Sequence, residues 1–194
     1  MDRRAFFKRA VGKATETVVK EADDKVKLDA VRWIRPPYAL DELEFLLTCT
    51  RCGECISACP YQVIFPLETR LGAKVLNTPA LDLLNKACHL CDDWPCVKAC
   101  EPGALKIDDV EEDEEISLPL LARAMINTAD CLPYSGPECG ACYGSCPLPN
   151  TLIWEMEKPR INQSNCTGCA LCREACIVEP KAVIITSLQA KAES

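Results

Sequence analysis

The cysteines are the feature that most restricts how this chain can fold. Sixteen of the 194 residues are Cys, a density at which cysteine chemistry determines the architecture. They form four quartets: Cys49, Cys52, Cys55 and Cys59; Cys88, Cys91, Cys96 and Cys100; Cys131, Cys139, Cys142 and Cys146; and Cys166, Cys169, Cys172 and Cys176. The first and fourth quartets have the spacing C-x2-C-x2-C-x3-C, the second has C-x2-C-x4-C-x3-C and the third has C-x7-C-x2-C-x3-C.

Disulfides, zinc sites and iron–sulfur clusters are the three chemistries that use so many cysteines. Disulfide frameworks are typical of small secreted chains with an apolar signal segment, and no such segment follows Met1. Zinc sites use two ligand pairs that are well separated in the sequence, rather than compact quartets. A [4Fe–4S] cubane takes four thiolates, so these quartets match four cubanes with no cysteine left over. We therefore expect four [4Fe–4S] clusters as cofactors.

The loop of each quartet has the composition that a cubane requires. Three closely spaced cysteines reach three corners of one cluster, and the fourth starts a helix and points toward a neighbouring cluster. Gly53 and Gly168 let backbone N–H groups approach the sulfur atoms. Pro60 and Pro147 follow a fourth cysteine, where proline fits the first helical turn. Ile177 takes that place in the last quartet, so we expect its turn to differ.

Two pairings of the quartets satisfy the rule that each fourth cysteine serves another quartet's cluster. In the sequential pairing the first quartet pairs with the second and the third with the fourth; in the nested pairing the first pairs with the fourth and the second with the third. We predict nesting, because the outer quartets share the compact spacing and the inner two are both stretched. The predicted ligand sets are Cys49, Cys52, Cys55 and Cys176; Cys166, Cys169, Cys172 and Cys59; Cys88, Cys91, Cys96 and Cys146; and Cys131, Cys139, Cys142 and Cys100.

The expected fold class is α+β, with nested bacterial-ferredoxin-like modules of two [4Fe–4S] clusters each, small strands and an N-terminal helical arm. The predicted division is an amphipathic helical arm with a proline linker at 1–37 and a four-cluster domain at 38–194, whose outer module is 38–70 with 155–194 and whose inner module is 71–154. The arm is expected because apolar residues such as Phe7, Val11 and Val18 recur at helical spacing over 4–30.

Shorter elements are expected around the quartets. Asp41 is placed to cap a short helix through Phe45, and Thr78-Pro79 has the signature of a second helix start ahead of Cys88. β-Branched segments predict small strands at Ala104–Ile107, Arg160–Asn162 and Ala182–Thr186.

Charge narrows the class of partner. The formal net charge is −7, and four thiolate-bound cubanes add roughly −8. Such an acidic protein is not expected to bind nucleic acid, and it favours a protein redox partner with a basic face. No apolar stretch is long enough to span a membrane. Arg3-Arg4 resembles a twin-arginine signature but lacks the apolar run behind it, so we expect a cytoplasmic location and a retained arm that docks a partner.

The remaining motifs do not indicate a substrate site. His89 is the only histidine, and the four-Cys arithmetic is complete without it, so we do not expect it to be a ligand. Trp94 is expected to cover one face of a cluster. The acidic run over 108–115 is interpreted as a solvated loop. No Ser–His–Asp set, P-loop or dinucleotide fingerprint is present in the sequence, so we expect an electron carrier without catalytic apparatus of its own.

Several motifs resemble the ferredoxin-type proteins of the NapF, NapG and MauM group. Ile34-Arg35-Pro36-Pro37 ahead of the first quartet, together with Arg3-Arg4, resembles the start of NapF. The run Cys131–Tyr134 followed by Glu138-Cys139 resembles the third quartet of NapF and NapG. The run Cys88–Cys96 resembles the second quartet of NapG and of the four-cluster electron-transfer subunits of molybdenum oxidoreductases, a resemblance that also favours nesting.

This resemblance implies an electron-transfer protein or subunit that passes single electrons to or from a larger oxidoreductase complex. The alternative that it implies is a cytoplasmic accessory factor, which assists maturation or cluster loading of a molybdenum-type reductase similar to nitrate reductase. A permanent electron subunit is expected to co-purify with its enzyme in fixed stoichiometry. An accessory factor is expected to bind the apo form of its partner better than the mature form.

Overall fold

Short helices and strands make up the regular structure. The computed structural model describes residues 25–107 and 117–190. Residues 25–29 are helical, and they are followed by η1 (Ala30–Arg32), α2 (Glu42–Thr48), α3 (Glu54–Ser57), β1 (Ile64–Pro66), η2 (Thr69–Leu71), β2 (Pro79–Leu81), α4 (Pro95–Lys98), β3 (Arg123–Ile126), α5 (Leu132–Ser135), β4 (Leu152–Glu155), β5 (Lys158–Ile161), α6 (Leu171–Glu174) and β6 (Val183–Thr186). This mixture confirms the α+β class.

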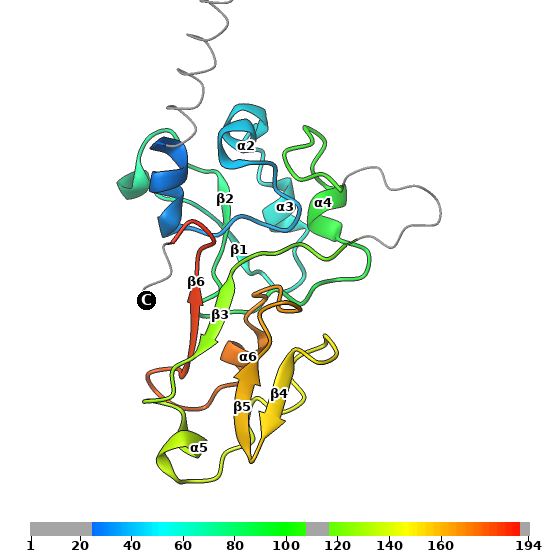
Figure 1. Cartoon of the computed structure of the whole chain (residues 1–194). Coiled ribbons are helices and arrows are strands. Elements are labelled where there is room, and N and C mark those ends of the chain that lie inside the picture. Colours follow the sequence, from blue (N-terminus) through cyan, green and yellow to red (C-terminus); the bar gives the residue numbers. More distant parts are fainter. Residues whose placement is uncertain (1–24, 108–116, 191–194) are drawn as a thin grey trace, which may run out of the picture.

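The strands form three antiparallel pairs, and these pairs divide the molecule into two halves. β1 pairs with β2 in the first half of the chain, whereas β3 pairs with β6 and β4 with β5 in the second half. Helices α2, α3 and α4 gather with β1 and β2 at one end of the molecule, and α5, β4 and β5 lie at the other end (Figure 1). Each half is therefore continuous in sequence, which differs from the predicted outer module of 38–70 with 155–194.

One apolar core runs through both halves. Phe45 and Leu105 belong to it from the first half, and Ala124, Val183 and Ile185 belong to it from the second. Ten cysteines contribute to or pack against this same cluster, so these ten thiols belong to the interior. Among the described residues no helix is both long enough and apolar enough to cross a bilayer.

A second, smaller core holds the start of the described chain. Ala30 and Trp33 are buried with Leu67, Val75 and Ala80. The indole Nε1 of Trp33 donates to Glu42 Oε1 at 3.1 Å. Residues 30–37 were predicted to belong to a separate arm, but this burial makes the segment from Ala30 part of the first half. Most of the predicted helix over 4–30 lies outside the described residues.

The buried ion pair between Arg35 and Glu42 fixes α2 against the strand pair. Arg35 Nε donates to Glu42 Oε2 at 2.9 Å, and its Nη2 lies 2.5 Å from Oε1. Its Nη1 donates to Thr78 Oγ1 at 2.9 Å and to the carbonyl oxygen of Pro79 at 2.8 Å. One guanidinium therefore ties the entry segment to both α2 and β2. The bidentate geometry is the strong form of this interaction.

Some of the helices and strands predicted from the sequence are present in the structure, and others are not. Helix α2 confirms the helix expected after Asp41, although it continues to Thr48 and Asp41 makes no side-chain capping bond. Strands β5 and β6 confirm two of the three expected strands. The helix start predicted at Thr78-Pro79 is wrong, because Thr78 is fully buried and Pro79–Leu81 pairs with β1 instead. In the segment expected as a strand at 104–107, Leu105 forms only an isolated bridge to Ala39.

Candidate iron–sulfur cluster sites

Four cavities in the structure are each lined by four cysteines. Site A is lined by Cys49, Cys52, Cys55 and Cys100; site B by Cys59, Cys88, Cys91 and Cys96; site C by Cys146, Cys166, Cys169 and Cys172; and site D by Cys131, Cys139, Cys142 and Cys176. Each of the sixteen cysteines lines one of these cavities and none is shared. Every site combines the first three cysteines of one quartet with the last cysteine of another.

This grouping is sequential, so the predicted nested pairing is wrong. Cys59 lies with the second quartet rather than the fourth, and Cys176 lies with the third quartet rather than the first. The physical reason is the packing of short helices: α3 and α4 lie against each other, and the cysteine that follows each helix reaches across to the other quartet's cavity. Spacing within a quartet shapes its own loop but carries no information about its partner.

Three of the quartets build the same local structure around their third cysteine. Cys55, Cys96 and Cys172 are each the second residue of a four-residue helix, in α3, α4 and α6. The residue that precedes each helix, Gly53, Trp94 or Ala170, has a left-handed backbone with φ of 82°, 46° or 70°. This conformation is unfavourable for non-glycine residues and persists only where the surroundings hold it. The repeated turn aims the third thiol into the cavity.

Two backbone amides donate to cysteine sulfur atoms, and the one at Gly168 was predicted from the loop composition. Gly168 N–H donates to Cys166 Sγ at 3.4 Å, and Leu105 N–H donates to Cys100 Sγ at 3.3 Å. Hydrogen bonds to the sulfur of a ligand stabilise the negative charge that a thiolate carries and adjust the reduction potential of the site.

Burial is the main influence on the protonation of these thiols, and neighbouring cysteines add to it. Burial raises the pKa of Cys88, Cys96 and Cys172 to about 12 and that of Cys55 and Cys142 to about 11. The neighbours that raise the pKa of Cys55 are Cys100, Cys49 and Cys52, which line the same cavity. Four thiolates crowded into such a cavity need a cationic group between them.

The donor set of each cavity fits a [4Fe–4S] cubane. The four cavities are alike in size. Within the described ranges no group of three or more His, Cys, Asp or Glu side chains is arranged to hold one metal ion. Four thiols around one cavity match the ligand number of a [4Fe–4S] core, which takes one thiolate on each iron.

His89 and Trp94 lie beside site B without adding a thiol. The imidazole of His89 stacks on Tyr61 with ring centroids 3.6 Å apart, and its Nε2 lies 3.7 Å from Glu174 Oε2. Trp94 is 7% exposed and lines site B, and its role of covering one face of a cluster stays a prediction. The rings of Tyr38 and Trp94 are nearly perpendicular, with centroids 4.9 Å apart.

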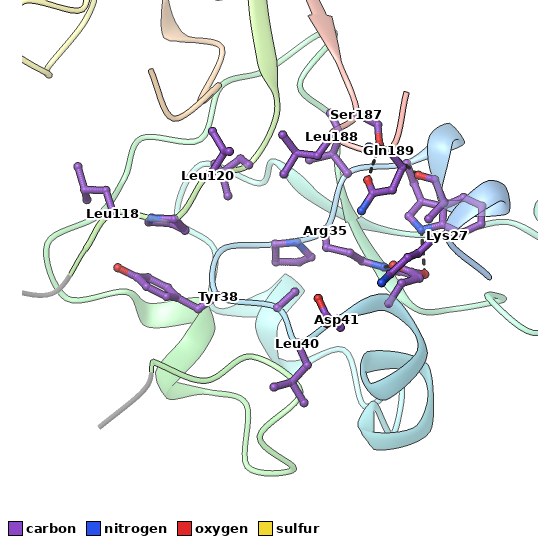
Figure 2. Close-up of a pocket in the computed structure, with 18 of the residues that line it drawn as sticks. Lys27, Arg35, Tyr38, Leu40, Asp41, Leu118, Leu120, Ser187, Leu188 and Gln189 are labelled. Atoms are coloured by element: carbon purple, nitrogen blue, oxygen red, sulfur yellow. Dashed lines mark hydrogen bonds and ion pairs between the residues drawn. The ribbon is translucent and has the colours of Figure 1, made fainter. Parts of the chain in front are cut away.

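A larger groove lies on the other side of Tyr38, and no cysteine lines it (Figure 2). Its walls come from residues 27–42, 117–121 and 187–189, so both halves of the chain contribute. Leu118 and Leu120 are exposed there, and Tyr38 Oη donates to the carbonyl oxygen of Ser117 at 3.1 Å. Tyr38 and Trp94 form a continuous aromatic contact between this groove and site B.

Comparisons with known proteins agree with these four cysteine cavities. A family described as a 4Fe-4S dicluster domain matches residues 124–177, which span the third and fourth quartets, and a 4Fe-4S binding domain matches residues 47–65. These matches and the cysteine cavities define the class: the chain is a ferredoxin-type 4Fe–4S iron–sulfur protein. No solved structure matches the chain.

Curated relatives give the particular family. The ferredoxin-type protein NapG of Escherichia coli is 32% identical over 169 residues, which cover 80% of this chain and 71% of NapG. The methylamine utilization ferredoxin-type protein MauM of Methylorubrum extorquens is 33% identical, over 77% of this chain and 70% of MauM. The ferredoxin-type protein NapF of Escherichia coli is 31% identical, over 75% of this chain and 80% of NapF. The chain belongs to the NapG, MauM and NapF family of ferredoxin-type proteins, which confirms an electron carrier rather than a catalytic enzyme.

Proposed function

We propose that the chain binds four [4Fe–4S] clusters, one in each of sites A to D, and passes single electrons to or from a larger oxidoreductase. The division of sixteen cysteines among four separate cavities, four thiols in each, is the observation that carries this proposal. When bound, such clusters supply reversible one-electron chemistry, at potentials that range from roughly −700 to +450 mV in different proteins.

The residues of the chain set the conditions for that chemistry. The thiols hold their positions because most are buried or half-buried in the same core as the apolar side chains. Trp94 is buried and lines site B, and the amides of Gly168 and Leu105 donate to cysteine sulfur atoms. Burial and hydrogen bonds of this kind determine the potential of a cluster, whereas the redox chemistry itself belongs to the cofactor.

The partner that suits this protein presents a basic face. The formal net charge is −7, and four thiolate-bound cubanes add a further charge of roughly −8. Opposite charge on the partner would accelerate encounter between the two proteins at low ionic strength. Docking through the N-terminal residues and a cytoplasmic location stay predictions, because residues 1–24 lie outside the described part. Fractionation of cells that express the tagged chain tests the location.

The first test is the metal content of the anaerobically purified chain. We expect about sixteen iron and sixteen sulfide per chain, because each cubane holds four of each. A preparation loaded with zinc, or one that holds only two clusters after full reconstitution, would contradict the proposal.

A pull-down separates the two roles that the family membership leaves open. An electron carrier should co-purify with its mature oxidoreductase and become oxidised or reduced during turnover of that enzyme. Preferential binding to the apo form of a molybdenum-type reductase would instead support the role of a cluster-loading or maturation factor.

A further inference from the structure

A single backbone hydrogen bond joins a site in the first half to a site in the second half. The N–H of Cys88 donates to the carbonyl oxygen of Cys169 at 2.9 Å. Cys88 lines site B and Cys169 lines site C. Both residues are buried, at 7% exposure each, so this contact lies in the interior and is shielded from solvent. The connection between the two cavities thus runs from one cysteine to the other through one hydrogen bond.

The contact gives the four sites a linear order. Sites A and B are built from the first two quartets, and sites C and D are built from the last two. Sites A and B exchange the last cysteines of their quartets, as do sites C and D, and helices α3 and α4, which carry Cys55 and Cys96, lie against each other. Together with the Cys88–Cys169 hydrogen bond, these contacts link A to B, B to C and C to D. Sites A and D are therefore the two ends.

Helix α6 supplies the side chains that hold the two halves together at this point. Glu174 Oε1 accepts the N–H of Ala87 at 3.3 Å, and the other carboxylate oxygen lies 3.7 Å from His89 Nε2. Ala87 and His89 flank Cys88 in the sequence, so one carboxylate contacts the residue on each side of Cys88. Arg173 Nε donates to the carbonyl oxygen of Leu84 at 3.0 Å and adds a second contact to the same segment.

We propose that electrons cross between the halves from site B to site C, or in reverse, along the Cys88–Cys169 contact, and that Glu174 is the positioning residue that maintains it. This inference rests on the proposed function, since it requires clusters in both sites. With clusters bound in both sites, each crossing would oxidise one of the two sites by one electron and reduce the other by one electron. No covalent bond forms or breaks. The external donor and acceptor are the redox partners, which exchange electrons with sites A and D.

Glu174 is suited to this role because its carboxylate contacts the segment beside Cys88 while its helix carries a thiol of site C. Cys172, which lines site C, lies two residues before Glu174 in α6. Removal of the carboxylate leaves the N–H of Ala87, a residue only 1% exposed, without its acceptor. A buried donor without a partner is unfavourable, so the segment around Cys88 should move away from α6.

The experiment uses the full chain, anaerobically loaded, with the variants Glu174→Ala and Glu174→Gln. Glutamine keeps an oxygen that can accept the Ala87 N–H, so it should restore what alanine removes. Glu155→Ala is the matched control, because Glu155 is exposed, lies in the second half and pairs with Arg160 within the β4–β5 hairpin. Pulsed electron double resonance between reduced sites measures the distances between the halves. Flash reduction with one electron measures how fast the sites equilibrate.

We expect wild-type iron content in all variants, with a longer or broader B–C distance and slower equilibration in Glu174→Ala alone. Unchanged distance and rate in a fully loaded Glu174→Ala chain would overturn the role of Glu174. Loss of iron from both Glu174 variants would overturn it too, because the carboxylate would then maintain site C itself. A wild-type chain with four clusters whose shortest inter-half distance is not B–C would overturn the order but leave the proposed function intact. A wild-type chain without four clusters would instead contradict the proposed function.

Discussion

The carbonyl oxygen of Ala122 lies 2.0 Å from the point that a Cβ atom on Gly168 would occupy. Gly168 stands between Cys166 and Cys169 of site C and has φ of 72°. The approach is close because the N–H groups of Leu121 and Ala122 both donate to the carbonyl oxygen of Thr167, at 2.8 and 3.4 Å. The segment before β3 is therefore bonded to the cluster loop directly beside this glycine.

Gly168→Ala is expected to disrupt site C, because a methyl group there would overlap the backbone of Ala122 and strain the left-handed residue. Gly53→Ala is the matched control in site A. Gly53 has φ of 82° but nothing lies within 4 Å of its Cβ position, so that variant carries only the backbone strain of about 1 to 2 kcal/mol. Iron per chain and the temperature of cluster bleaching are the measurements. Equal behaviour of the two variants would show that the Ala122 contact has no influence on site C.

The sequential grouping predicts how pairs of cysteine substitutions combine. Cys59→Ala should remove about four iron per chain, since it takes one ligand from one cubane. Adding Cys88→Ala should remove no more, because both residues line site B. Adding Cys166→Ala to Cys59→Ala should raise the total loss to about eight iron per chain, because Cys166 lines site C. The nested pairing gives the opposite result for these two double variants, so iron analysis distinguishes the pairings directly.

The buried pair of Arg35 and Glu42 predicts a non-additive effect on stability. The side chains are 10% and 3% exposed, so removing one partner leaves a buried charge. Arg35→Met is expected to destabilise the first half by about 3 to 5 kcal/mol, which is the usual cost of breaking such a pair. The double variant Arg35→Met with Glu42→Leu should be less destabilised than Arg35→Met alone. Bleaching temperatures of the single and double variants test this, and simple additivity would contradict it.

Local chemistry in this chain could be predicted from the sequence, and long-range pairing could not. The quartets identified every thiol that lines a cavity. Strand β6 was predicted correctly because every residue of Val183–Thr186 is β-branched. Thr78-Pro79 has a helix-start signature, but pairing with β1 and the bond from Arg35 override it. The quartet pairing depends on which helices pack together. The shortest linker between quartets, from Cys146 to Cys166, was the one signal for neighbouring third and fourth quartets.

The start of the chain offers the last prediction, because its described part belongs to the core. Trp33 is 5% exposed, packs with Leu67 and Val75 and donates to Glu42, whereas residues 1–24 lie outside the described part. A chain that begins at residue 25 is therefore expected to keep its full iron content and to bind its redox partner more weakly, if the N-terminal residues dock that partner.

A chain that begins at residue 34 is expected to behave differently. It lacks Trp33, and deletion of a buried aromatic side chain costs about 3 to 5 kcal/mol. Site A should be the first to lose iron, since Phe45 of α2 lines it and α2 loses the Trp33 contact to Glu42. Trp33→Ala in the full-length chain is the control, and it should reproduce the loss of iron but not the loss of partner binding. Full iron in the chain that begins at residue 34 would show that the small core around Trp33 does not support site A.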